Sequence, residues 1–171
     1  MMQRLLGGLS LALAYLVAGK LGLMLALPPG YASGIFPAAG LAVGAAYLWG
    51  RRTLLWIFLG SLLLNLWVGA SSTSATTTAA ATCVALASAL QAWWGCAVLR
   101  AALGRRTRLD SDTSVTRYLL LSPVIALVSA SISVLSLFGL GVVGAGERLE
   151  TWGFWWLGDT LGIAAVFPRV L

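Results

Sequence analysis

The run LALAYLVAGKLGLMLAL, residues 11–27, is apolar apart from one charged residue, Lys20. A second run near the other end, WGFWWLGDTLGIAAVF, residues 152–167, contains the single charge of Asp159. A charge near the centre of a membrane helix costs about 2.5–3.5 kcal/mol, so such residues usually pair, face a cavity or take part in function. The two runs therefore predict membrane helices, and each supplies one candidate functional residue.

The composition of the whole chain also predicts a membrane protein. Hydrophobic residues make up 60% of the 171 residues and charged residues 9%, and the mean hydropathy is +0.93. A water-soluble protein of this length needs more charge on its surface. We expect an all-α, polytopic helix bundle in which residues 1–171 form a single transmembrane domain. At this length there is no room for a separate soluble catalytic domain.

Six membrane helices are predicted along the chain. Pro28-Pro29-Gly30 ends the first, and Pro37 suits the first turn of the second. The second helix is short, and we expect the preceding segment, Pro28–Phe36, to dip into the bundle as a re-entrant element. The predicted spans are Leu5–Leu27, Pro37–Trp49, Leu54–Gly69, Ala79–Leu99, Tyr118–Val143 and Trp152–Val170.

Basic residues are distributed unevenly between the two ends of these spans. If six spans alternate, one side carries only Arg148, beside Glu147 and Glu150. The other side carries Arg4, Arg51, Arg52, Arg100, Arg105, Arg106, Arg108, Arg117 and Arg169. The positive-inside rule then places both termini in the cytoplasm. The net charge of +6 is explained by this topology, so we expect no binding of nucleic acid.

Lys20 and Asp159 are predicted at the same depth in the membrane. Lys20 lies seven residues before the outer end of the first span, and Asp159 lies seven residues after the outer start of the sixth. At about 1.5 Å per residue, both are roughly 10 Å below the outer boundary. We expect the first and sixth helices to touch there and the two charges to pair. The alternative is that each side chain reaches water or headgroups separately.

Asn65 and Gln91 place amide groups inside the third and fourth spans. They either form hydrogen bonds between helices or line, with Lys20 and Asp159, a small-molecule pocket that opens outward. The start of the second helix at Pro37 would present backbone N–H groups to such a pocket, which favours an anionic or carbonyl-bearing ligand. The chain has no histidine and no paired carboxylates, so we expect no metal, no cofactor and no catalytic residue.

Several blocks of the sequence resemble the first type of membrane-associated sensor (MASE) domain. They are Phe36-Pro37-Ala38-Ala39-Gly40-Leu41-Ala42, Gly50-Arg51-Arg52, Trp56-Ile57-Phe58-Leu59-Gly60 with Asn65, and Trp155-Trp156-Leu157-Gly158-Asp159-x-Leu161-Gly162 with Pro168. The last block is the most specific and makes Trp156, with Asp159, a candidate ligand-binding or switch residue. The family commonly has Trp-Pro-Pro-Ala-Gly where this chain has FPAAG, residues 36–40. Family domains also usually continue through further helices, so we expect a short member or a shortened form.

The resemblance implies an input module of the bacterial inner membrane that precedes a cytoplasmic histidine kinase or diguanylate cyclase domain. It would detect a small-molecule or membrane-protein signal, and the full-length protein would be a homodimer. Two other functions stay open on topology alone. One is the substrate-binding membrane subunit of a small-molecule uptake system, and the other is a subunit that senses a partner membrane protein. A downstream kinase or cyclase domain favours sensing, whereas a neighbouring ATPase gene favours uptake.

Overall fold

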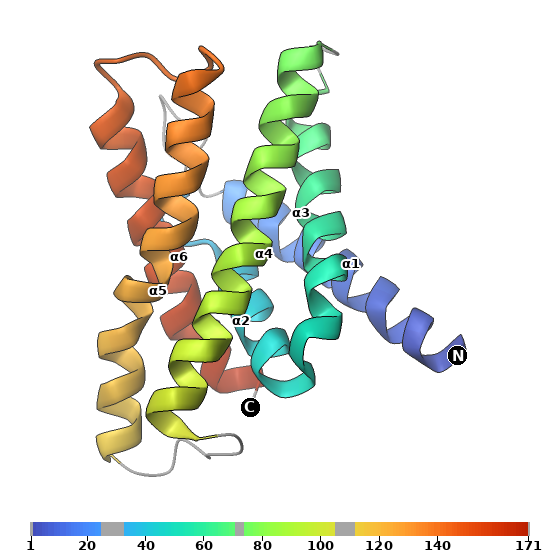
Figure 1. Ribbon diagram of the computed structural model, residues 1–171, viewed down its shortest axis with the longest axis vertical. Helices are drawn as coiled ribbons and strands as arrows, with labels where there is room; N and C mark the ends of the chain where they lie inside the picture. The colour runs from blue at the N-terminus through green and yellow to red at the C-terminus, as the bar shows by residue number, and fades with distance from the viewer. Residues whose placement is uncertain (1, 25–32, 71–73, 105–111, 171) are drawn as a thin grey trace.

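The computed structural model describes residues 2–24, 33–70, 74–104 and 112–170, and these are helical almost throughout (Figure 1). The predicted all-α class is confirmed for this part of the chain. The elements are α1 (Met2–Leu23), α2 (Pro37–Trp49), the 3₁₀ turn η1 (Gly50–Thr53), α3 (Leu54–Val68), α4 (Ala75–Leu103), α5 (Asp112–Gly139) and α6 (Arg148–Val170).

Four stretches of the described chain are long and apolar enough to cross a membrane: Met2–Leu23, Pro37–Val68, Ala75–Leu103 and Asp112–Gly139. The second comprises α2, η1 and α3, and the chain turns back on itself at η1 (Figure 1). The 13 residues of α2 extend about 20 Å, which is shorter than the roughly 30 Å hydrocarbon core. A membrane-spanning helical protein is therefore supported, and the exact number of six crossings stays a prediction.

The connections between helices gather at two ends of the bundle. The turn from α2 to α3, the end of α4, the start of α5 and the C-terminus lie at the bottom in Figure 1, whereas α3 meets α4, and α5 meets α6, at the top. Arg51 and Arg52 in η1 and Arg100 in the last turn of α4 therefore lie at the same end. This arrangement has the charge asymmetry that the positive-inside argument requires; the location of the termini in the cytoplasm stays a prediction.

Several helix ends differ from the predicted ones, and the structure gives a local reason for two of them. Helix α4 begins at Ala75 instead of Ala79 because the Ser74 hydroxyl accepts a hydrogen bond from the Thr77 N–H at 3.1 Å and caps the helix. Helix α5 ends at Gly139 instead of Val143. There Gly141 has a positive φ of 71°, which a glycine adopts without strain and which ends the helix.

The segment before α2 lies inside the bundle, as the re-entrant prediction requires. Ser33 is buried, and its Oγ lies 2.6 Å from the carbonyl oxygens of Gly22 and Ile35. The Phe36 N–H donates to the carbonyl of Gly158 on α6 at 2.9 Å. Irregular backbone at membrane depth needs partners of this kind because lipid supplies none. Ser33 and Phe36 thus have the contacts with the bundle that the prediction requires, and the re-entrant path stays a prediction; residues 28–32 lie outside the described part.

Glycines on α6 allow this close approach. A Cβ atom added to Gly158 would overlap the carbonyl oxygen of Ser33, and one added to Gly162 would overlap that of Phe36. Glycine on α2 does the same in the other direction, since a Cβ on Gly40 would overlap the carbonyl oxygen of Gly162. The spacing of four residues between Gly158 and Gly162 therefore acts as a packing surface for backbone, in the way small residues act between membrane helices.

Candidate functional site

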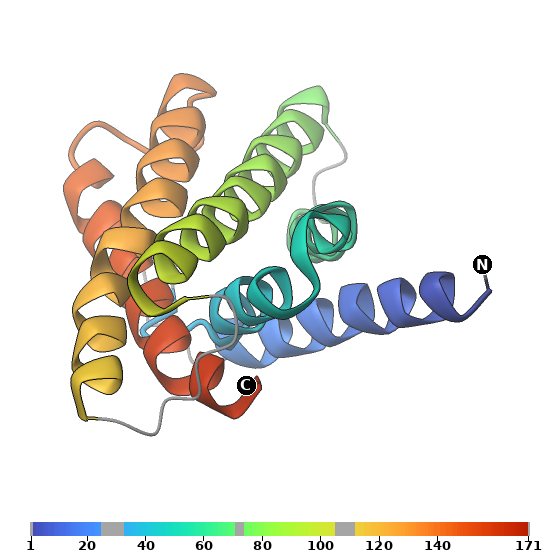
Figure 2. The same ribbon diagram turned by 60° about the horizontal axis from the view of Figure 1, so that its bottom comes forward.

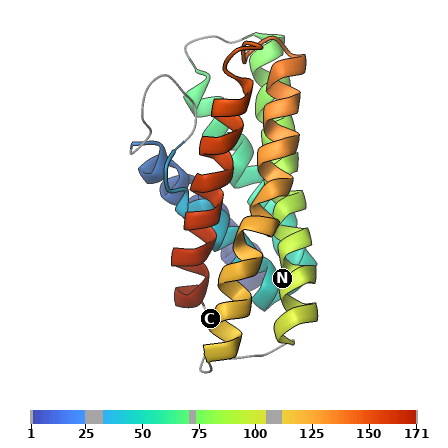
Figure 3. The ribbon, with the colours of Figure 1, turned by 90° about the vertical axis from the view of Figure 1, so that its left-hand side faces the viewer.

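The predicted ion pair between Lys20 and Asp159 is not formed, and this expectation was wrong. Helix α1 packs mainly on α3 and α2, whereas α6 packs mainly on α5 and α2. Figure 2 shows α1 extending away from the rest of the bundle, and Figure 3 shows α6 beside α5. The Lys20 ammonium lies 4.8 Å from the ring centre of Trp67 on α3, which is a cation–π contact. Equal height along a bundle does not decide which helices are neighbours.

Asp159 instead faces a partly open cavity between the helices. The cavity volume is about 40 Å³, which admits a few water-sized molecules. Every α-helix contributes to its wall. The lining residues are Tyr15, Leu23, Ser33, Phe36, Ala39, Ser61, Leu64, Asn65, Val84, Ser88, Gln91, Ser129, Trp155 and Asp159. Among these described residues Asp159 is the single charged one, and none is basic.

Two polar atoms on this wall are buried without a hydrogen-bond partner. Asp159 is 2% exposed and Gln91 is 3% exposed, and neither Asp159 Oδ2 nor Gln91 Nε2 has a partner. The side chains of Ser129 and Gln91 lie beside the Asp159 carboxyl group, but Gln91 Nε2 makes no hydrogen bond of normal geometry. Each unsatisfied buried group costs about 1–3 kcal/mol. A bundle optimised for stability alone would not keep an acceptor and a donor unpaired on one cavity.

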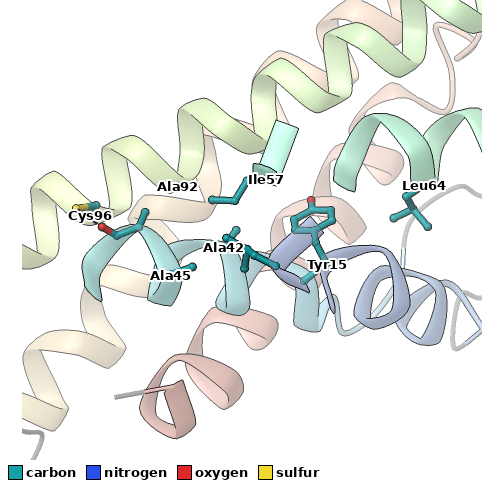
Figure 4. Close-up of a cluster of buried hydrophobic side chains, with 10 residues drawn as sticks. Tyr15, Ala42, Ala45, Ile57, Leu64, Ala92 and Cys96 are labelled. Atoms are coloured by element: carbon teal, nitrogen blue, oxygen red, sulfur yellow. Dashed lines mark hydrogen bonds between the residues drawn. The ribbon is translucent and has the colours of Figure 1, made fainter. Parts of the chain in front are cut away.

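A second set of polar groups on the cavity is linked by hydrogen bonds. The Tyr15 hydroxyl lies 3.1 Å from Ser88 Oγ, which is 3.1 Å from Ser61 Oγ. The Asn65 amide donates to the Ser61 carbonyl at 2.8 Å. Tyr15 and Leu64 also belong to the apolar cluster between α1, α2, α3 and α4 (Figure 4). This network joins three helices around the cavity and leaves the Asp159 side as the part with free hydrogen-bonding capacity.

Comparison with protein families gives a match over nearly the whole chain. The model of the MASE1 family matches residues 8–171. The chain belongs to the MASE1 family. Comparisons with curated proteins and with solved structures found no match. MASE1 is a family of membrane-associated sensory domains, so the apolar helices are those of a multi-pass membrane protein with a sensory role.

The cavity of this MASE1 domain unites half of the residues predicted from sequence. Asn65, Gln91 and Asp159 line it, as the pocket interpretation expected. Lys20 is absent from its described lining. Trp156 is absent from the described lining; its Nε1–H donates to the Pro123 carbonyl on α5 at 2.8 Å and its ring stacks on Trp152. Pro37 begins α2 next to Phe36, and it is Phe36, not Pro37, that lines the cavity.

The start of α2 offers fewer donors to a ligand than the sequence suggested. The Phe36 N–H is bonded to the Gly158 carbonyl and the Ala39 N–H to the Phe36 carbonyl, at 2.9 and 3.1 Å. Pro37 has no N–H. An anionic ligand at this helix start would need unpaired backbone N–H groups. Neither Phe36 nor Pro37 has a free N–H to donate.

Sequence reasoning missed the hydroxyl groups of the site. Tyr15, Ser61, Ser88 and Ser129 line the cavity but were not singled out. A signal was present, since Ser61 precedes Asn65 by four residues and Ser88 precedes Gln91 by three, which places each pair on one helix face. Serine is weak evidence in an apolar helix because its hydroxyl often bonds to its own backbone, as Ser88 does to the Val84 carbonyl.

Proposed function

We propose that this MASE1 domain is an input module of a bacterial inner membrane that detects a small molecule in the Asp159 cavity. The module would relay binding to a cytoplasmic output domain outside residues 1–171. The observation that carries the proposal is the pair of buried, unpartnered atoms on one cavity wall, Asp159 Oδ2 and Gln91 Nε2. A ligand that satisfies both atoms recovers the energy that they cost.

Helix α6 is the element best suited to relay binding. It carries Asp159 at the cavity and Phe167 eight residues further on, roughly 12 Å along the helix. The Phe167 ring stacks on Tyr118 of α5 at 4.9 Å and meets Tyr47 of α2 edge-on at 5.4 Å. A shift of α6 at Asp159 would therefore change the packing of three helices near the end from which an output domain would follow. A ligand shifts the position of such a helix only if it binds one position of the helix more tightly than the other.

The test joins residues 1–171 to a diguanylate cyclase output domain and measures cyclic dinucleotide in cells. Asp159→Asn and Gln91→Leu each remove one unpartnered atom, so we expect both to fix the output at one level, whatever the growth conditions. The matched control is Thr160→Val, because Thr160 neighbours Asp159 but donates to the Trp156 carbonyl of its own helix. Output from all three variants equal to that of the parent would refute sensing through this cavity, provided that membrane levels are equal.

The other functions considered for the sequence make different predictions. A partner-sensing subunit would co-purify with a second membrane protein and would keep its response after Asp159→Asn. An uptake component would move a labelled ligand across the membrane. We expect homodimerisation in the full-length protein and no catalytic activity in residues 1–171, with any enzyme activity belonging to the output domain.

A further inference from the structure

We propose that the ligand held at Asp159 is a small monovalent cation, either an inorganic ion such as Na⁺ or a protonated amine of the size of ammonium or methylammonium. This inference rests on the proposed function for its biological role, but the binding itself is a property of the cavity. It goes against the anionic ligand that the sequence suggested, and the structure gives four physical reasons.

The first reason is the charge of the wall. Asp159 is nine-tenths or more buried, with one carboxylate oxygen unpartnered, and no basic side chain stands among the described lining residues. Lys20, which the sequence predicted as the partner of Asp159, instead contacts the Trp67 ring. An ionised carboxylate buried in this way costs several kcal/mol unless a positive charge or a proton compensates it. A bound cation supplies this compensation and also gives the unpartnered oxygen a partner.

The second reason is the chemistry of the other polar groups. Beside its apolar side chains, the wall carries neutral hydroxyl and amide groups from Tyr15, Ser33, Ser61, Asn65, Ser88, Gln91 and Ser129. Hydroxyl, amide and carboxylate oxygens are the ligands that hard cations prefer. They also accept hydrogen bonds from an ammonium group. A water bound to the cation would in turn accept from Gln91 Nε2, so both unpartnered atoms would be satisfied together.

The third reason is size. A cavity of about 40 Å³ admits a few water-sized molecules. A small ion with its bound water fits this space, and so does methylammonium. A sugar phosphate, a nucleotide or a carboxylic acid with a long chain does not fit without movement of the helices.

The fourth reason is that one carboxylate matches one positive charge. No group of three or more His, Cys, Asp or Glu capable of holding a metal occurs among the described residues. A divalent ion at Asp159 would therefore keep a net positive charge in a low-dielectric site. The paired N–H groups at Phe36 and Ala39, and the missing one at Pro37, remove most of the attraction for an anion.

The experiment measures thermal unfolding of the purified chain in lipid nanodiscs at constant ionic strength. Choline chloride, whose cation is larger than the other cations tested, is replaced stepwise by NaCl, KCl, NH₄Cl or methylammonium chloride, with MgCl₂ and choline phosphate as further arms. A ligand that binds the folded state raises the unfolding temperature as its concentration exceeds its dissociation constant. We expect a saturable rise with at least one small monovalent cation. The inorganic and amine arms distinguish the two sources.

Variants connect the rise to the cavity. Asp159→Asn keeps the shape but removes the charge, and we expect it to weaken the cation effect by at least about 100-fold. If that variant does not fold, Ser129→Ala removes a neighbour of the carboxyl group and should weaken it by about 10-fold. Thr160→Val should respond like the parent chain. Lys20→Met should also respond fully, since Lys20 lies outside the described lining.

Three results would overturn the inference: no small cation acts differently from choline, Mg²⁺ or phosphate gives the larger shift, or Asp159→Asn responds like the parent. These outcomes are separable from failure of the proposed function. Cation binding with unchanged reporter output would make the cation a structural ion and would end the sensing proposal. If Asp159→Asn loses the reporter response but no cation raises the unfolding temperature, the sensing proposal stands and the cation is not the ligand.

Discussion

Gly162 of α6 and the backbone of Phe36 are in direct contact, with no space for a side chain between them. One turn earlier on α6, the Gly158 carbonyl accepts a hydrogen bond from the Phe36 N–H at 2.9 Å. One turn of α6 therefore contacts the irregular segment before α2 at two points. Because Asp159 lies in the same turn, this contact also fixes the height of the carboxyl group relative to the cavity.

Gly162→Ala should destabilise the domain strongly. The added Cβ would meet the Phe36 carbonyl oxygen and carbon, which are backbone atoms and cannot rotate away. Overpacking of this kind costs about 1–3 kcal/mol or more, and thermal unfolding in nanodiscs measures it. Gly153→Ala on the same helix is the control, because nothing lies within 4 Å of its added Cβ. Equal unfolding temperatures for the two variants would show that the Gly162 contact is not tight.

The sequence predicts local features of this fold but not which helices become neighbours. Apolar runs and proline positions predict α2 with its observed bounds, Pro37–Trp49, because these signals are local. The neighbour relations are not local. Lys20 and Asp159 were predicted to pair, yet their helices pack mainly on different partners and Lys20 contacts Trp67. The family block around Asp159 located the site, whereas the hydroxyls of Tyr15 and Ser129 appear only once the helices are assembled.

Lys20→Met should have a small effect on stability. The ammonium group contacts the Trp67 ring at 4.8 Å, and a cation–π contact at a partly exposed site contributes about 0.5–1 kcal/mol. A buried ion pair with Asp159 would instead cost about 3–5 kcal/mol when broken. A double-mutant cycle of unfolding temperatures distinguishes the two. We expect Lys20→Met to couple with Trp67→Leu and to be additive with Asp159→Asn, and coupling with Asp159 alone would contradict the structure.

Tyr118→Phe should loosen the attachment of α6 to α5 while keeping the aromatic packing. The Tyr118 hydroxyl is buried and donates to the Ile163 carbonyl on α6, and its ring stacks on Phe167 at 4.9 Å. Removal of the hydroxyl alone should cost about 1 kcal/mol in thermal unfolding. In the cyclase fusion, we expect the response to the signal to weaken. Thr53→Val, which removes a buried hydroxyl that donates to the Gly50 carbonyl away from the cavity, controls for a general loss of stability.

Asp159→Asn should make the domain more stable in choline buffer, even as it removes the signal response. The parent chain keeps a buried carboxyl group with an unpartnered oxygen, and an uncompensated buried charge carries a desolvation penalty of several kcal/mol that the substitution removes. The asparagine amide leaves a neutral unsatisfied group, which costs less. Unfolding temperatures in choline, compared with those of Thr160→Val, measure the difference. A less stable Asp159→Asn variant would mean that the carboxyl group holds the helices together, and the cavity would then be a structural feature and not a binding site.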